Sequence, residues 1–192
     1  MGRRIVVWGA TGSGKTSMGR TIAESLGLGF VELDAIRHHT GWDSTPWEEF
    51  RTILSERLET LHDGWVCDGA YPQVMDIVLA RTDTLVWLHL PFRVTFCRLL
   101  KRTIVGAWTR EPLYNPDGPS ESWRMTFLSR RSILWWAITS HGPRERQIPE
   151  RIAALPPAVR VYELRSAREV REFLGRIPGQ SKDANSSSVR PV

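Results

Sequence analysis

Eight residues near the N-terminus have the types and spacing of a phosphate-binding loop. They are Gly9, Ala10, Thr11, Gly12, Ser13, Gly14, Lys15 and Thr16, which match the pattern G-x-x-x-x-G-K-[ST]. Glycines allow the backbone to wrap closely around a phosphate, because a Cβ would obstruct the inward-pointing N–H groups. Lys15 supplies positive charge for the terminal phosphates, and the Thr16 hydroxyl is a suitable ligand for the Mg²⁺ that accompanies a nucleotide. The sequence therefore predicts a nucleotide-binding site.

The segments on either side of this loop support that prediction. The apolar run Ile5-Val6-Val7-Trp8 is typical of a buried strand, and apolar residues at spacings of three and four predict a helix from Ser17 to Leu26. The N-terminus of a helix carries partial positive charge and free N–H groups, which favour phosphate binding. We therefore include Ser17 among the nucleotide-binding residues.

Two aspartates follow apolar runs that are predicted to be strands. Asp34 comes after Val31-Glu32-Leu33, and Asp68 comes after Trp65-Val66-Cys67. The carboxyl ends of parallel strands open on one crevice, so we expect both carboxylates to face Lys15 and Thr16. There they could hold Mg²⁺, and Asp34 could bind the acceptor or take a proton from its hydroxyl. The alternative is that each aspartate only caps the turn that follows it.

Basic residues are predicted to complete the site. Phosphoryl transfer requires neutralisation of the moving charge and exclusion of water. Arg98 and Arg102 lie four residues apart in a helix predicted from Phe92 to Ile104, and Arg110 lies in a segment of about 105–125 that we expect to form a lid. Each of these arginines could also belong to a solvated helix face.

Strand-like and helix-like segments alternate along the chain, which favours an α/β fold with a parallel sheet flanked by helices. The predicted strands are Arg4–Trp8, Gly29–Leu33, Gly64–Asp68, Thr84–Leu90 and Arg160–Leu164. Beyond those already named, the predicted helices are Trp47–Leu61, Arg124–Thr139 and Ala167–Gly175. We expect one domain over residues 1–177 and a disordered tail over 178–192, which is rich in serine and asparagine.

The composition excludes some function classes. The chain has 192 residues, of which 41% are hydrophobic and 24% charged, and it contains no apolar stretch long enough to span a membrane. Met1-Gly2-Arg3-Arg4 leads directly into a strand rather than into a signal sequence, so we expect a cytoplasmic protein. Cys67 and Cys97 lie in apolar segments without metal-like spacing, and we expect both to be buried thiols.

Five segments together resemble a known family. They are GATGSGKT, VELDAI, CDGAY, LVWLHLP with the following RLLKR, and LRSAREVREFL. From about Arg4 to Ile177 the chain resembles the adenylate-kinase-like P-loop proteins of the bacterial topology modulation protein (FlaR-like) family. This resemblance implies a kinase of the nucleoside and nucleotide type, with a five-stranded parallel sheet in the order 2-3-1-4-5 and a helical lid.

The resemblance also implies roles for particular residues. Arg165 and Ser166, after the fifth strand, stand where such folds pass close to the adenine ring of ATP. The implied acceptor residues are Asp34, Arg37, Arg51, Asp68, Gly69 and Tyr71. Adenylate kinases continue after the Asp-Gly pair with a proline and an arginine, whereas this chain has Ala70-Tyr71-Pro72-Gln73. This departure argues against a nucleoside monophosphate as the acceptor.

Two functions remain open at the level of the sequence. The first is an ATP- and Mg²⁺-dependent phosphotransferase that acts on an unidentified small-molecule acceptor. The second is a nucleotide-dependent regulatory or nucleic-acid-associated ATPase module, for which an arginine-rich chain of net charge +5 is suitable. The sequence shows no DNA-reading motif, and its basic residues are spread rather than gathered in one run. It does not indicate the oligomeric state.

Overall fold

The computed structural model describes residues 1–38, 43–109 and 133–178. Its elements are, in chain order, β1 (Arg4–Gly9), α1 (Lys15–Leu26), β2 (Gly29–Glu32), α2 (Leu33–Arg37), α3 (Trp47–Thr60), β3 (Trp65–Asp68), α4 (Met75–Leu79), β4 (Thr84–Leu88), α5 (Phe92–Thr109), α7 (Ile133–Ala153), β5 (Arg160–Leu164) and α8 (Ala167–Gly175). The strands form one parallel sheet in the order β2-β3-β1-β4-β5. This is the fold of the nucleoside and nucleotide kinases, so the predicted fold class is confirmed.

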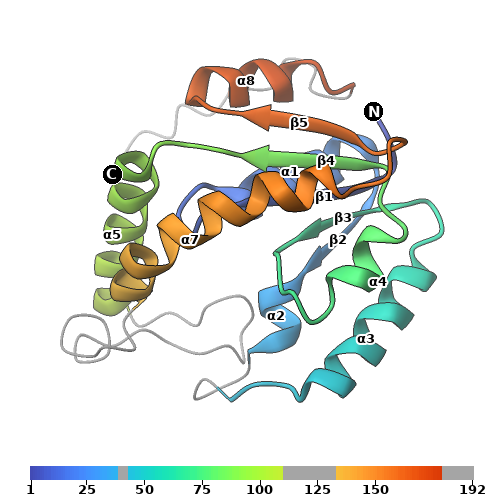
Figure 1. The fold of residues 1–192 in the computed structure, drawn as a ribbon, viewed down its shortest axis with the longest axis horizontal. Coiled ribbons are helices and arrows are strands. Elements are labelled where there is room, and N and C mark those ends of the chain that lie inside the picture. The colour runs from blue at the N-terminus through green and yellow to red at the C-terminus, as the bar shows by residue number, and fades with distance from the viewer. Residues whose placement is uncertain (39–42, 110–132, 179–192) are drawn as a thin grey trace, which may run out of the picture.

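Helices cover both faces of the sheet, because the central strands are apolar on both sides. On one face, α1 and α8 pack against Val7, Val86 and Leu164. On the other face, α3, α4 and the C-terminal part of α7 pack against Trp8, Cys67 and their neighbours. Figure 1 shows α7 crossing this second face, with the segments that join strands to helices gathered at one end of the sheet. The carboxyl ends of the strands therefore lie between two helical layers.

The structure corrects several predicted boundaries. Two short helices, α2 and α4, were not predicted, because five-residue helices carry too little periodicity to detect. Helix α5 continues to Thr109, beyond the predicted end at Ile104. Helix α7 runs from Ile133 to Ala153, although Gly142-Pro143 is a typical stop signal and the prediction ended at Thr139.

The expectation for the cysteines is correct for one of them. Cys67 is buried in β3, where burial raises the pKa of its thiol, whereas Cys97 is exposed on α5. Within residues 1–38, 43–109 and 133–178, no helix is long and apolar enough to cross a membrane. The predicted tail from 179 onward and residues 110–125 of the predicted lid lie outside the described residues.

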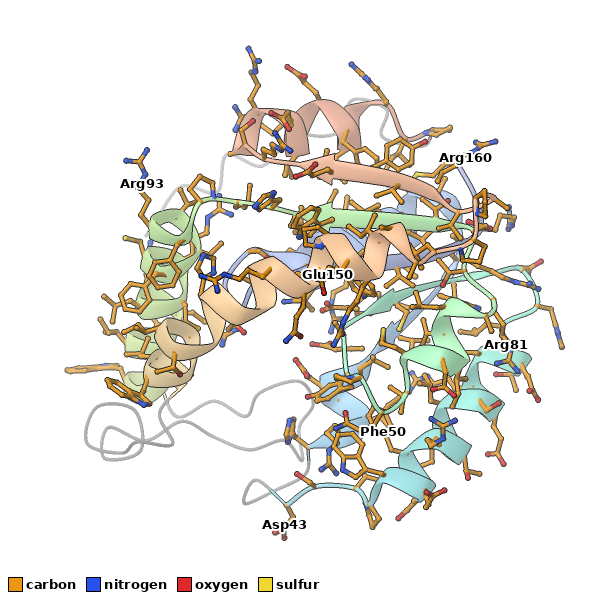
Figure 2. The ribbon with its side chains drawn as sticks, viewed as in Figure 1. Asp43, Phe50, Arg81, Arg93, Glu150 and Arg160 are labelled. Atoms are coloured by element: carbon orange, nitrogen blue, oxygen red, sulfur yellow. The ribbon has the colours of Figure 1, made fainter. Side chains whose placement is uncertain are left out.

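Phe50 anchors α3 and offers a test of this packing. Its side chain is fully buried, and Figure 2 labels it on α3. We expect Phe50→Ala to lower the free energy of unfolding by about 3–5 kcal/mol, because it removes buried apolar surface and leaves a cavity. Denaturant unfolding measures this loss. Glu56→Ala, at an exposed position of the same helix, is the control, and an equal loss in both variants would contradict the assigned packing.

Candidate functional site

The glycine-rich loop joins β1 to α1 and lies against α5. Gly12 has a φ of +82°, and a Cβ built there would stand 2.3 Å from the Thr95 carbonyl oxygen. Gly14 has a φ of +92°, but no heavy atom lies within 4 Å of the corresponding Cβ position. Gly12 is thus required for the close approach to α5, whereas Gly14 is required by its backbone conformation alone.

Lys15 and Thr16 begin α1 and face different partners. Lys15 Nζ donates to the Ala10 carbonyl oxygen at 3.2 Å, so its ammonium group lies across the loop. The Thr16 hydroxyl donates to Asp68 Oδ2 at 2.5 Å. The parallel register that pairs Val7 with Asp68 brings this carboxylate to the start of α1. The predicted meeting of Thr16 and Asp68 is therefore present in the structure.

Asp68 is a buried carboxylate with unused hydrogen-bonding capacity. It is 4% exposed, and its Oδ1 has no hydrogen-bond partner among the described residues. Burial raises the pKa of Asp68, while the charge of Lys15 and the hydrogen bond from Thr16 act in the opposite direction. A buried acceptor without a partner is costly, which indicates that a ligand or water completes this site.

The group around Asp68 is suitable for Mg²⁺. This ion prefers oxygen ligands and usually retains several waters. The free Asp68 Oδ1 and the adjacent Thr16 hydroxyl are oxygen donors of this kind at the start of α1. Within the described residues, no group of three or more His, Cys, Asp or Glu side chains has a geometry that could hold a metal ion, so the remaining ligands would be nucleotide oxygens and water.

Glu32 is a second buried carboxylate, which the sequence analysis did not single out. It is 8% exposed at the end of β2 and forms a 2.8 Å ion pair with Arg20 of α1. Burial raises the pKa of Glu32, the Arg20 contact lowers it, and the charges of Asp68 and Asp34 raise it further. A charged residue inside the apolar run Val31-Glu32-Leu33 was the available signal.

Asp34 lies within electrostatic range of Asp68 but has a different partner. Its Oδ1 accepts a hydrogen bond of 2.5 Å from the Tyr71 hydroxyl, and His38 Nε2 lies 3.2 Å from the same hydroxyl. The structure thus unites two of the predicted acceptor residues, Asp34 and Tyr71. It does not join Asp34 to Thr16, because α2 begins at Leu33 and turns the chain away from the loop.

The two arginines predicted to bind the acceptor already have protein partners. Arg37 donates to the Thr45 carbonyl oxygen, and its guanidinium carbon lies 3.9 Å from the centre of the Trp47 ring. Arg51 makes two hydrogen bonds to Asp76, of 2.8 and 2.6 Å. The Asp76 carboxylate thus occupies one edge of the Arg51 guanidinium in this structure.

The predicted lid arginines differ in their placement. Arg98 approaches the loop, since its Nη1 donates to the Ser13 carbonyl oxygen at 3.4 Å. Arg102 is exposed one turn later on α5, and Arg110 lies outside the described residues. Arg93, in the first turn of the same helix, projects outward into solvent in Figure 2.

The predicted adenine-side residues stabilise the start of α8. The Ser166 hydroxyl caps this helix by accepting from the Glu169 N–H at 3.2 Å, and it donates to Glu169 Oε1. Arg165 holds both carboxylate oxygens of Glu163, at 2.8 and 3.0 Å. This pairing and the contact with His89 lower the pKa of Glu163. In this structure the Arg165 side chain is thus engaged on its own strand.

A cavity of about 200 Å³ lies between the loop, α5 and α7. Its lining consists of Trp8, Gly9, Ala10, Thr11, Ala70, Pro72, Phe92, Thr95, Phe96, Ala137, His141, Gln147, Ile148 and Arg151. The contribution of α7 was missed, because the predicted helix ended before His141. Among the described residues, this lining does not include Asp34, Arg37 or Arg51.

A parallel sheet in this order, with a glycine-rich loop after β1 and a buried carboxylate after β3, defines a P-loop kinase. A model of the shikimate kinase family matches residues 11–153. A shikimate kinase from Synechococcus sp. (strain CC9605) is 49% identical over 144 residues, covering 69% of this chain and 70% of that protein. Another, from Mycobacterium avium (strain 104), is 29% identical over 163 residues, covering 78% and 88%. The chain belongs to the shikimate kinase family and is an ATP-dependent kinase that uses ATP and Mg²⁺.

Two solved kinase structures align with most of this chain at low sequence identity and with TM-scores below 0.5. A sugar kinase from Janibacter sp. HTCC2649 is 18% identical, with a TM-score of 0.49 and coverage of 91% of this chain and 94% of that chain. A shikimate kinase from Bacteroides thetaiotaomicron is 16% identical, with a TM-score of 0.49 and coverage of 90% and 94%.

These comparisons correct the family suggested by the sequence motifs. The resemblance to nucleotide-kinase-like P-loop proteins is confirmed, but the matched family is shikimate kinase rather than the topology modulation proteins. The quoted motifs come mostly from the glycine-rich loop and the strand ends. Because these segments serve the nucleotide in many P-loop kinases, they do not distinguish one acceptor family from another.

The buried Asp68 carboxylate leads to a prediction for stability. Because its pKa is raised above the usual 3.8, the folded chain holds a proton there at pH values where the unfolded chain has released it. The contribution of Asp68 to stability therefore becomes less favourable as the pH rises through this window. We expect the difference in melting temperature between Asp68→Asn and the wild type, taken as variant minus wild type, to become more positive when the pH is raised from 4 to 8. The exposed Asp63→Asn variant is the control, and a difference that stays constant with pH would contradict the assignment.

Proposed function

We propose that this kinase transfers the γ-phosphoryl group of ATP to a hydroxyl group of shikimate. The observation that carries the proposal is the family match over residues 11–153, which span the loop from Thr11, both aspartates and the α7 side of the cavity. The relatives from Synechococcus and Mycobacterium avium are themselves named shikimate kinases.

The cavity has the chemistry of such an acceptor. Shikimate is a six-membered carbon ring with one carboxylate and three hydroxyl groups. The rings of Phe92 and Phe96 offer apolar surface, and Arg151 offers a guanidinium group that pairs well with a carboxylate. The buried Trp8 Nε1 has no hydrogen-bond partner within the described residues, so its N–H group could donate to an oxygen of the ligand.

The loop is proposed to hold the nucleotide. Its backbone N–H groups and the N-terminus of α1, from Gly9 to Ser17, would surround the phosphates. Lys15 would exchange its contact with the Ala10 carbonyl oxygen for a phosphate oxygen. Bound Mg²⁺ neutralises phosphate charge, and Thr16 and Asp68 are the residues that would hold it. We retain Arg165 and Ser166 as the proposed residues on the adenine side.

The reaction is a single displacement at phosphorus. An acceptor hydroxyl oxygen forms a new bond to the γ-phosphorus, and the bond from this phosphorus to the bridging oxygen of the β-phosphate breaks, so that ADP leaves. The hydroxyl proton would pass to Asp34, which is hydrogen-bonded to Tyr71 between the cavity-lining residues Ala70 and Pro72, and then to solvent. Arg98 and Arg102 on α5, together with Arg110, would neutralise the charge on the transferred group.

The direct test is ADP release from ATP and Mg²⁺, with and without shikimate. We expect shikimate to raise the rate at least tenfold and its phosphate ester to be recovered. Lys15→Ala should lower kcat/KM by about 10²-fold or more, because a charge that stabilises the transition state is lost. Lys101→Ala, at an exposed site of α5, is the control.

Two results would contradict this proposal. Stimulation by another small polyol or carboxylate, but not by shikimate, would show that the protein is a kinase with a different acceptor. A slow rate that no acceptor changes would favour the regulatory ATPase interpretation instead.

Arg151 supplies a prediction about acceptor binding. It lies on α7 in the cavity lining, and its Nη2 is 3.5 Å from Gln147 Oε1. We expect Arg151→Ala to raise the KM for shikimate about 10- to 100-fold, because a charged hydrogen bond is lost, while the KM for ATP stays within about twofold. Steady-state kinetics with each substrate varied measures this split. Arg146→Ala, exposed on the same helix, is the control. An equal rise in both KM values would show that Arg151 does not bind the acceptor specifically.

A further inference from the structure

A short hydrogen bond joins the side chains of Tyr71 and Asp34 on the acceptor side of the site. The Tyr71 hydroxyl donates to Asp34 Oδ1 at 2.5 Å, a length typical of an O–H donor bonded to a charged carboxylate. The two residues are 37 positions apart and come from α2 and from the loop after β3. Among residues 1–38, 43–109 and 133–178, no other side chain donates a hydrogen bond to Asp34.

His38 extends this contact into a chain of three groups. Its Nε2 lies 3.2 Å from the Tyr71 hydroxyl oxygen. A tyrosine hydroxyl has one hydrogen, and this hydrogen points to the carboxylate, which only accepts. The hydroxyl oxygen must therefore accept from His38, which places a hydrogen on Nε2 of that imidazole. The polarity of the chain runs from His38 through Tyr71 to Asp34.

The packing of the Tyr71 ring fixes the position of its hydroxyl. The ring meets Phe50 edge-on at 5.8 Å between centroids and Trp47 at 5.9 Å. Gly69, two residues earlier, has a φ of +128°, and a Cβ there would stand 2.9 Å from the Leu33 Cβ. The loop thus passes tightly over the start of α2, and the aromatic packing of the Tyr71 ring places its hydroxyl beside Asp34.

We infer that Tyr71 is a positioning residue for the Asp34 carboxylate. By occupying Oδ1, it leaves Oδ2 as the oxygen that receives the acceptor hydroxyl and holds the carboxylate in one rotamer for that contact. His38 orients the tyrosine hydroxyl. A small misplacement of a reacting group costs a large factor in rate, so the role is kinetic as well as structural. This inference rests on the proposed function, in which Asp34 contacts the acceptor.

Tyr71→Phe tests the role, because it keeps the ring and removes only the hydroxyl. We expect kcat with shikimate to fall about 10- to 100-fold, the loss of one hydrogen bond to a charged group. The KM for ATP should stay within about twofold. Tyr162→Phe is the matched control, since Tyr162 packs against Phe173 on the opposite face of the sheet. A kcat within twofold of the wild type in Tyr71→Phe would overturn the inference.

A double-mutant cycle separates positioning from a general structural effect. In an Asp34→Asn background, we expect Tyr71→Phe to change kcat less than about threefold, because the oriented carboxylate is already absent. Equal fold losses in both backgrounds would show that Tyr71 acts independently of Asp34 and would also overturn the inference.

The same cycle in melting temperature tests the contact without an acceptor. Here we expect the two single substitutions to give shifts that are not additive, and additive shifts would show that the hydrogen bond contributes nothing. If the wild type is not stimulated by shikimate, only the proposed acceptor fails. The kinetic cycle is then run with whichever acceptor stimulates the wild type, and the thermal cycle stands in either case.

Discussion

The parallel pairing of β1 with β3 decides where the chemistry of this protein is located. Because Val7 is in register with Asp68, the glycine-rich loop leaves β1 beside the carboxylate that ends β3. The 2.5 Å hydrogen bond from Thr16 to Asp68 then fixes the first turn of α1 against that strand. Gly12 in turn allows the loop to lie close to α5, so the loop, the Asp68 carboxylate and α5 pack together.

The cost of burying negative charge in this part of the structure is offset by specific cations. Glu32 and Asp68 are both buried, and the charge of Asp68 raises the pKa of Glu32. Arg20 pairs with Glu32 directly, while Lys15 acts on Asp68 through its charge. Buried carboxylates with shifted pKa values are common in catalytic sites, and Mg²⁺ held at Asp68 would offset part of this negative charge.

The proposed acceptor side differs from the nucleotide side, because aromatic packing contributes more to it. An aromatic cluster of Trp47, Phe50 and Tyr71 holds one polar group in place, and α7 closes a cavity with mainly apolar walls. The acceptor arginines that the sequence suggested, Arg37 and Arg51, are engaged with the protein itself. Kinases that share one kind of nucleotide site can in this way differ in their acceptors, because only the residues that line the acceptor cavity differ.

The sequence by itself determined the nucleotide side, because the loop, its strand and its helix are contiguous and their spacing is set by local backbone geometry. It also indicated the alternation of strands with the longer helices and the meeting of Asp68 with Thr16, but not the short helices α2 and α4. Only the tertiary structure showed the contacts of the proposed acceptor side, in which Asp34 is hydrogen-bonded to Tyr71 and α7 brings Arg151 to the cavity. Those contacts join residues from separate elements, and no local pattern records a distance between side chains that are far apart in the chain.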